Sequence, residues 1–580
     1  MRNITIKSSL QLTQDQRELL EQGIKNKSLG EVTFNYVLDD SVIGIIVLDG
    51  ETLVDASLTA ELHRIKKNYD NLYADMRKGI SVTELPHFIK DRLSSLVNHH
   101  IDIKLYGKVV SVADGIVKIT GLSTCKYGEL IVIGRKNSPA LVMNLERESV
   151  GAILLSSADE IEYGDFAYSI GKILEVPVGK ELLGRIVNPL GVPVDGLGRI
   201  RTKNHRRVES DAPPIRMRDK VNEPLYTGIL AIDAMIPIGK GQRELIIGDR
   251  QTGKTSIAVD AIINQAGKGV YCVYVAIGQK ASSVNKLVKT LKKHDALRYT
   301  VIVYSTASDP PSLQYIAPYA GAAIAEHFMY EGKDALIIYD DLSKHAVAYR
   351  TISLLLRRPV GREAYPGDIF YIHSRLLERA AKLNASSGGG SLTALPIIET
   401  QAGDISSYIP TNVISITDGQ IYLERELFNS GIRPAINVGL SVSRVGGSAQ
   451  NKMMNKLSAK IRLALSHYKE LQIFTQFGAS IEEETRKTLE SGARIVEALK
   501  QKEHHPLSVL KEEIFLIAIT NGYLKSIKIA DISRFLDSYY AFALEQLGQT
   551  SGTEHTLSKE EFALLSEVSE QFVEGWGKGL

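Results

Sequence analysis

The chain of 580 residues contains only two cysteines and one tryptophan, and its charges nearly cancel. Cys125 and Cys272 lie far apart in the sequence, which predicts neither a disulfide framework nor a cysteine metal site and favours a reducing compartment. Lys and Arg together number 69 against 67 Asp and Glu, a formal net charge of +2. This balance argues against a protein that coats nucleic acid, because such binding needs clustered and uncompensated cations.

Long apolar runs are also missing. No stretch approaches the roughly 18 uninterrupted apolar residues that indicate a membrane-spanning helix. Residues 1–7 lack the apolar core of a secretory signal and the Arg- and Ser-rich character of a transit peptide. The sequence therefore predicts a chain that does not span a membrane, although such a chain can dock on a membrane-bound assembly.

The chain is too long for a single hydrophobic core, and changes of pattern predict five segments. Residues 1–72 alternate strands and helices, which predicts a small α+β module, and residues 73–99 predict a helical linker. Short, turn-separated strands over residues 100–172 are typical of a small β-barrel. Strands and helices alternate over residues 173–450, which predicts a parallel α/β sheet. Residues 451–580 have the apolar periodicity of a helical bundle.

Local patterns predict individual elements. Near-continuous apolar runs at 270–277, 299–304 and 335–339 are suited to central parallel strands. Asp49-Gly50 is a hairpin signal in the first module. Helices are expected to begin near residues 13, 57 and 84. Further strands are expected at residues 32–36, 43–48, 108–112, 116–119, 130–133, 141–145 and 150–155.

Residues 248–255 form a complete phosphate-binding loop between an apolar strand and a helical run. Its glycines allow backbone N–H groups to surround a polyphosphate, Lys254 places a charge on the outer phosphates, and the Thr255 hydroxyl can ligate Mg²⁺. The residues expected to bind the nucleotide here are Gly248, Asp249, Arg250, Gln251, Thr252, Gly253, Lys254, Thr255 and Ser256.

Asp340 ends the apolar run at 335–339, at the carboxyl edge where open α/β sheets bind ligands. A carboxylate in this place can orient the water shell of a Mg²⁺ ion held by Thr255. Asp341 is the alternative, and a solvated acid with no metal role is the plainer interpretation. The expected metal ligands are Thr255 and Asp340.

The phosphate loop stands in the first of several long blocks, at residues 239–255, 338–344, 357–379, 408–420 and 431–446. Together these blocks resemble the alpha subunit of the rotary F-type ATP synthase, over about residues 80–575. The resemblance implies ATP or ADP and Mg²⁺ as ligands and a hetero-hexameric ring shared with beta-type catalytic subunits. It also implies a gamma-type shaft, a peripheral stalk subunit, and a place at the cytoplasmic face of a bacterial inner membrane. Indirect coupling to a membrane sector that conducts protons or sodium ions is implied as well, with protons as the family default. No nucleic acid is expected.

The resemblance assigns roles to further residues. In the similar beta subunit a glutamate polarises the attacking water, whereas the corresponding residue here is Gln279. A carboxamide cannot act as a base, so the sequence predicts a site that binds Mg-nucleotide but hydrolyses it poorly. Arg444 resembles an arginine finger that reaches the γ-phosphate in the partner's catalytic site. Ser415 is expected at that catalytic interface, and the residues expected in this chain's own pocket are Phe428, Arg433 and Pro434.

The sequence departs from the family pattern in two places. The family has glutamine near the adenine at two positions; Gln501 matches the first and Glu503 replaces the second. Because a carboxylate offers no amide donor, the pattern predicts phosphate binding more firmly than adenine selectivity. Residues 1–72 are additional to a typical alpha subunit, and they resemble the carboxyl-terminal domain of the delta subunit, the peripheral-stalk connector. An unrelated interaction module is the alternative.

Two other functions share parts of this pattern. A hexameric nucleic-acid translocase also combines a phosphate-loop ring with a β-barrel, but it needs stacking aromatics and a basic groove, and the barrel stretch offers few aromatics and mixed charges. An alpha-like subunit recruited for motility or export is compatible with the sequence. We therefore expect a non-catalytic, ATP-binding alpha-type subunit of a rotary ATP synthase.

Overall fold

The computed structural model describes residues 2–8, 32–39, 44–49, 52–57, 103–122, 124–134, 136–156, 161–475, 483–548 and 556–577, with a few positions between 12 and 21. The chain divides into two compact units, Met1–Leu174 and Glu175–Leu580. The helices expected near residues 57 and 84, and most of the helix expected near residue 13, lie outside the described residues.

Six antiparallel strands of the first unit close into a β-barrel, as the sequence predicted. Their order is β5-β6-β9-β8-β7-β10, and the pairing of β10 with β5 closes the ring. Along β7, Ile131 and Ile133 are buried and alternate with half-buried residues, which is the period of a strand with one face in a core. Strand β10 was not predicted. The strands are β5 (Ile103–Ala113), β6 (Ile116–Thr120), β7 (Glu129–Ile133), β8 (Ser138–Leu145), β9 (Ser149–Leu154) and β10 (Phe166–Ile173).

A small sheet precedes the barrel, in the order β4-β3-β1-β2. Strands β3 and β4 form the hairpin expected at Asp49-Gly50, with Asp49 opposite Thr52, although β4 itself was not predicted. Strand β4 also pairs antiparallel with β5, with Thr52 opposite Leu105. The small sheet therefore continues into the barrel. Its strands are β1 (Arg2–Ser8), β2 (Val32–Leu38), β3 (Gly44–Asp49) and β4 (Thr52–Ser57).

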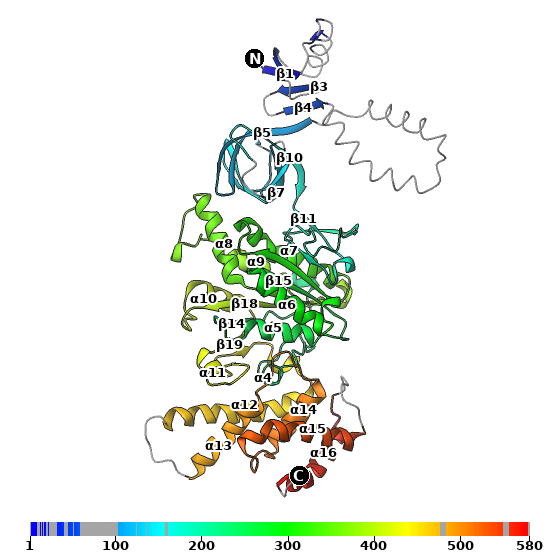
Figure 1. Ribbon diagram of the computed structural model, residues 1–580, viewed down its shortest axis with the longest axis vertical. Coiled ribbons are helices and arrows are strands. Elements are labelled where there is room, and N and C mark those ends of the chain that lie inside the picture. The colour runs from blue at the N-terminus through cyan, green and yellow to red at the C-terminus, as the bar shows by residue number, and fades with distance from the viewer. Residues whose placement is uncertain are drawn as a thin grey trace, which may run out of the picture. The chain divides into compact units, whose positions relative to one another are not determined.

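The second unit is built on an eight-stranded sheet, parallel except at β20, with helices packed around it (Figure 1). The order is β12-β16-β15-β17-β18-β14-β19-β20. Strand β14 is buried along its whole length, which agrees with its continuous apolar sequence. The strands are β12 (Ile186–Val187), β14 (Leu245–Asp249), β15 (Val270–Gln279), β16 (Thr300–Thr306), β17 (Asp334–Asp340), β18 (Ser391–Thr400), β19 (Gly419–Leu423) and β20 (Val442–Ser443), with a separate pair, β11 (Glu175–Pro177) and β13 (His205–Arg207).

Two of the helices around this sheet begin next to residues of the predicted site. Helix α5 follows Gly253, whose φ of 98° lies in the left-handed region that favours glycine. Helix α8 is capped by Asp341, which accepts a hydrogen bond from the backbone N–H of Lys344. The helices are α4 (Leu230–Met235), α5 (Lys254–Ile263), α6 (Ala281–Lys293), α7 (Pro311–Tyr330), α8 (Leu342–Leu355), α9 (Ile369–Leu377), α10 (Tyr408–Ile416) and α11 (Arg425–Asn429).

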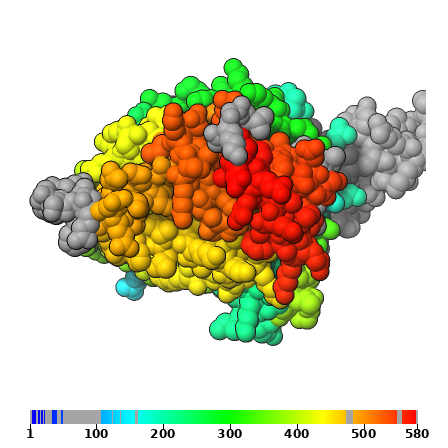
Figure 2. Space-filling view, turned by 90° about the horizontal axis from the view of Figure 1, so that it is seen from below, coloured from blue at the N-terminus to red at the C-terminus, as the bar shows by residue number. Residues whose placement is uncertain are grey.

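The remaining helices pack together at the carboxyl-terminal end of the second unit, where they cover one face (Figure 2). Leu457, Ile461 and Leu465 are buried at the helical spacing that the sequence showed. None of the helices in the described ranges is long and apolar enough to cross a membrane. The helices are α12 (Lys452–Thr475), α13 (Glu483–Ala498), α14 (Val509–Thr520), α15 (Ile532–Leu547) and α16 (Lys559–Gly577).

Candidate nucleotide-binding site

The phosphate loop joins β14 to α5 at the carboxyl edge of the sheet. Gly248 needs its lack of a side chain, because a Cβ atom there would lie 2.5 Å from the backbone oxygen of Leu423. Inside the loop, the Thr252 hydroxyl donates to the Asp249 carbonyl at 2.8 Å. The loop therefore has the tight backbone geometry that presents N–H groups to an anion at the start of a helix.

Lys254 points back into this loop. Its Nζ donates to the backbone oxygens of Gly248, at 2.8 Å, and of Asp249, at 2.5 Å. Burial lowers the pKa of Lys254, and nearby carboxylates, Glu399 first among them, oppose that shift. Among the described residues this buried ammonium is paired only with neutral carbonyl oxygens, which favours the approach of an anion such as a phosphate.

Asp340 lies at the end of β17, beside the loop. Its Oδ2 accepts hydrogen bonds from the Thr255 hydroxyl at 2.9 Å and from the Tyr274 hydroxyl at 2.5 Å. Its Oδ1 accepts a hydrogen bond from Gln279 Nε2 at 3.1 Å. The Thr255 and Asp340 oxygens thus converge on one point, and Gln279 faces the same carboxylate as a donor.

Asp341, the alternative metal ligand, instead caps helix α8. Its carboxylate caps α8 at 2.8 Å from the Lys344 backbone nitrogen and forms an ion pair with the Lys344 side chain at 3.1 Å. Burial raises the pKa of Asp341 to about 6, with Lys344 opposing that shift. These contacts favour Asp340 over Asp341 as the residue that faces a metal ion.

A pocket runs from the phosphate loop to the segment after α11 and the segment after α13. The Arg433 guanidinium lies over the Phe428 ring, 4.3 Å from its centroid, and the two form one side of the pocket. The predicted residues that line it are Thr252, Gly253, Ser256, Phe428, Arg433, Pro434, Gln501 and Glu503.

Gln501 is occupied by backbone contacts. Its Nε2 donates to the carbonyl oxygens of Gly228, at 2.7 Å, and of His505, at 2.9 Å, and its Oε1 accepts from the Leu230 backbone N–H at 3.2 Å. These bonds use both donors of the amide. Gln501 therefore holds the pocket wall in place, and the exposed carboxylate of Glu503 is the group that is better placed to meet a base.

Sequence reasoning missed Asp260 and His504. Asp260 lines the pocket from α5 and accepts hydrogen bonds from the His504 backbone N–H at 2.9 Å and from the His504 ring at 3.1 Å. Burial raises the pKa of Asp260, while His504 opposes that shift. The sequence carried no signal for this pair, because its members lie 244 residues apart.

Arg444 and Ser415 do not line this pocket. Ser415 is exposed on α10, where its hydroxyl donates to the Asn412 carbonyl at 2.7 Å. Arg444 follows β20, with an exposed side chain and a backbone N–H that donates to the Asp418 carbonyl at 2.8 Å. Both residues therefore present their side chains at the surface of this chain.

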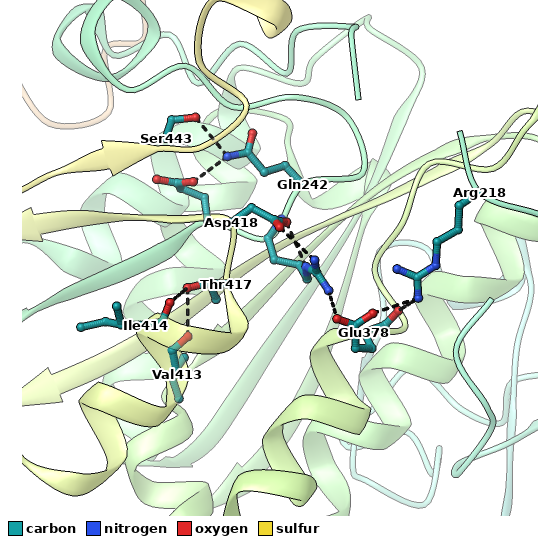
Figure 3. A network of polar contacts seen from close by, with 10 residues as sticks. Arg218, Gln242, Glu378, Val413, Ile414, Thr417, Asp418 and Ser443 are labelled. Atoms are coloured by element: carbon teal, nitrogen blue, oxygen red, sulfur yellow. Dashed lines mark hydrogen bonds and ion pairs between the residues drawn. The ribbon is translucent and has the colours of Figure 1, made fainter. Parts of the chain in front are cut away.

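A network of polar side chains surrounds Asp418, whose backbone carbonyl accepts the hydrogen bond from the Arg444 N–H (Figure 3). Two bonds of 2.9 Å join the Arg243 guanidinium to the Asp418 carboxylate, and the same guanidinium contacts Glu378. Arg218 reaches Glu378 from the other side at 3.0 Å. Paired guanidinium–carboxylate contacts of this kind fix geometry, so the backbone that carries Arg444 has a rigid support.

Three regions of the chain match described families. Residues 228–443 match the ATP synthase alpha/beta family, nucleotide-binding domain, and residues 450–572 match the ATP synthase alpha/beta chain, C terminal domain. The ATP synthase subunit alpha of Caldanaerobacter subterraneus subsp. tengcongensis is 55% identical over 495 residues, which are 84% of this chain and 97% of that protein. The chain belongs to the family of F-type ATP synthase alpha subunits.

The third match covers residues 1–69, which resemble the ATP synthase delta (OSCP) subunit. The predicted resemblance of the amino-terminal module to delta is thereby confirmed, together with the resemblance of the rest of the chain to alpha. As an alpha subunit, the chain is part of a complex that makes or hydrolyses ATP. A nucleotide-binding role agrees with the pocket beside the phosphate loop.

Proposed function

We propose that this alpha subunit binds Mg-ATP without hydrolysing it and alternates in a ring with beta-type catalytic subunits. The observation that carries the proposal is the Gln279 amide, which donates to Asp340 at 3.1 Å. Hydrolysis needs a group that accepts a proton from the attacking water or fixes that water in line with the γ-phosphate. In this arrangement the Gln279 amide N–H groups donate to Asp340, and the amide oxygen is too weak a base to take a proton from the attacking water.

The residues of the phosphate loop fit a Mg-nucleotide. The backbone N–H groups of the loop and Lys254 would hold the phosphates, and the Thr255 hydroxyl and Asp340 would hold Mg²⁺ directly or through water. Mg²⁺ commonly takes one or two protein ligands and completes its shell with water and phosphate oxygens, so a threonine and one carboxylate suffice. When bound, the ion supplies positive charge against the β- and γ-phosphates.

Arg444 serves the neighbouring subunit in this proposal. Its exposed side chain stands on the segment that Arg243, Asp418 and Glu378 support, and a rigid support favours placing a guanidinium beside a developing negative charge. Such arginines increase the rate of phosphoryl transfer by about 10³- to 10⁵-fold. Ser415, exposed on α10, would lie at the same interface.

In the assembled enzyme the chain would surround a gamma-type shaft and couple ATP turnover to proton flow through a membrane sector that it does not itself enter. We place the complex at the cytoplasmic face of a bacterial inner membrane. The match of residues 1–69 to the delta subunit supports a contact of this module with the peripheral stalk.

The test uses the purified chain alone. We expect a fluorescent ATP analogue to bind in the presence of Mg²⁺, with phosphate release at the level of a protein-free blank. Lys254→Ala should weaken the binding at least tenfold, because it removes a charge-assisted contact to phosphate. Lys292→Ala, an exposed lysine on α6, is the matched control and should bind as the wild type does. Sustained turnover by the isolated chain would rule out the non-catalytic assignment.

A further inference from the structure

A second cavity, of about 110 Å³, lies between the nucleotide-binding domain and the helical bundle. Ala231 of α4 and Ile432 and Ile436 of the segment after α11 line it from one side. Leu465 of α12 and Val496 of α13 line it from the other. Most of its wall is therefore aliphatic, and such a cavity favours an apolar occupant over water.

One end of this cavity is cationic. Lys469 of α12 lines it, is half-buried, and donates from Nζ to the Asn437 side-chain oxygen at 2.6 Å. Burial lowers the pKa of Lys469, while Glu424 opposes that shift. No ion pair of Lys469 occurs in the part of the chain that the structure describes, so an ammonium stands at an apolar cavity with a neutral acceptor only.

Lys254 resembles Lys469 in two respects, a pKa lowered by burial and hydrogen bonds to neutral acceptors. Burial lowers the pKa of both lysines, and within the described ranges both donate only to neutral oxygens. Lys240, by contrast, is also half-buried but pairs with Asp334 at 2.7 Å. At Lys254 the missing anion is supplied by a ligand in the proposed function. The same reasoning, applied to Lys469, indicates an anionic ligand.

We propose that this cavity binds a short aliphatic monocarboxylate, with its carboxylate on Lys469 and its chain between Ile432, Leu465 and Val496. The size of the cavity limits the chain. A cavity of about 150 Å³ holds a benzene ring, so this one has room for an alkyl chain of roughly four to five carbons beyond the carboxylate. A single carboxylate matches the single ammonium at the polar end.

The two pockets share a wall. Three segments supply residues to both pockets, for example Ile229 and Ala231 around the start of α4, Phe428 and Leu427 on α11, and Gln501 and Leu499 after α13. Pro434 lines both.

Because the wall is shared, a nucleotide that widens the first pocket would move the wall toward the second cavity. A bound carboxylate would resist that movement, and it would therefore weaken nucleotide binding. This coupling rests on the proposed function, as does the comparison of Lys469 with Lys254, whereas the cavity and the contacts of Lys469 stand without it.

The experiment measures hexanoate binding to the purified full chain by saturation-transfer NMR and equilibrium dialysis, first without nucleotide. We expect saturable binding below about 10 mM, no binding of hexylamine, and no binding of dodecanoate at the same site. Lys469→Met should weaken hexanoate binding at least tenfold, because it keeps the length of the side chain and removes its charge. Val496→Phe, which fills the cavity from a half-buried position, should weaken hexanoate binding to a similar extent.

The second arm repeats the ATP-analogue titration with saturating hexanoate. We expect the apparent dissociation constant to rise severalfold in the wild type and to stay unchanged in Lys469→Met. Hexanoate that does not bind, or that binds both variants as it binds the wild type, overturns the site. Hexanoate binding without an effect on the nucleotide overturns the coupling alone. Failure of the ATP analogue to bind, with hexanoate binding intact, would count against the proposed function and leave the carboxylate site standing.

Discussion

Glu512 of α14 allows a test of how the helical bundle is held to the nucleotide-binding domain. It is fully buried, and as an ionised carboxylate it would have no hydrogen-bond donor among the described residues, whereas a proton on it is shared in a hydrogen bond with Asp233. Its neighbour Asp233 accepts three hydrogen bonds, from the Thr227 backbone and hydroxyl and from the Gly228 backbone, at 2.8–2.9 Å. Burial raises the pKa of Asp233 too, but its hydrogen bonds from Thr227, Gly228 and Glu512 oppose that shift. Asp233 therefore carries the negative charge and Glu512 holds the proton. Burial first, and then the charge of Asp233, raise the pKa of Glu512 well above its ordinary value.

The sign of the pH dependence follows from the proton count. Above the ordinary glutamate pKa of about 4.3, the unfolded chain releases a proton that the folded chain keeps, so the free energy of unfolding falls as pH rises. One proton corresponds to about 1.4 kcal/mol per pH unit, up to the raised pKa. Glu512→Gln has nearly the same shape and no proton to lose. The free energy of unfolding of Glu512→Gln minus that of the wild type should therefore increase by about 1.4 kcal/mol for each unit of rising pH. The two free energies should become equal near pH 4.

Urea unfolding of both proteins between about pH 5 and pH 8, followed by circular dichroism of the bundle, measures the difference. Glu513→Gln is the control on the same helix. Glu513 accepts from the Asn451 side chain at 2.8 Å and from the Leu557 backbone at 2.7 Å, so its substitution should destabilise the protein by about 1–3 kcal/mol at every pH. Parallel pH profiles for Glu512→Gln and the wild type would refute a proton held on Glu512.

Arg444→Ala should leave binding of the ATP analogue to this chain within about twofold and lower hydrolysis by a ring reassembled with beta-type subunits by about 10³ or more; equal losses in both assays would place Arg444 in its own subunit's site. Glu503→Gln should raise affinity for ATP relative to GTP, because an amide can donate and accept at the edge of the adenine whereas a carboxylate only accepts. Competition between the two nucleotides measures this ratio, and an unchanged ratio would remove Glu503 from contact with the base. Deleting residues 1–69 should preserve nucleotide binding and weaken capture of the stalk subunit in a pull-down, and normal capture would contradict the stalk role of this module.

The parts of the fold that sequence reasoning predicted are those encoded by neighbouring residues. The phosphate loop is complete within residues 248–255, and strands such as β14 and β17 are continuous apolar runs. Strand β10 was missed because most of its residues are exposed or half-buried, which leaves no alternation of apolar and polar residues. What defines it is its pairing with β5 and β7, and the register of that pairing is not visible in the strand itself.

The candidate site was also predictable only where its residues belong to a local sequence pattern. Lys254, Thr255 and Asp340 could be found because each belongs to a motif or ends a strong strand. The role of Gln501 could not, since its amide bonds to backbone groups about 270 residues earlier in the chain, and only the folded structure shows that both of its donors are taken. The second cavity depends on four separate segments, none of which has an unusual sequence.

The pairing of β4 with β5 has a mechanical consequence. Three residue pairs, from Thr52 opposite Leu105 to Val54 opposite Ile103, join the amino-terminal sheet to the strand that also closes the barrel. A pull along the direction of these strands loads their hydrogen bonds together, in shear, whereas a pull across the sheet edge opens them one after another like a zipper. A force that the stalk applied to the amino-terminal module parallel to β5 would therefore meet high mechanical resistance at the β4–β5 pairing. A force applied perpendicular to the strands would meet low resistance there.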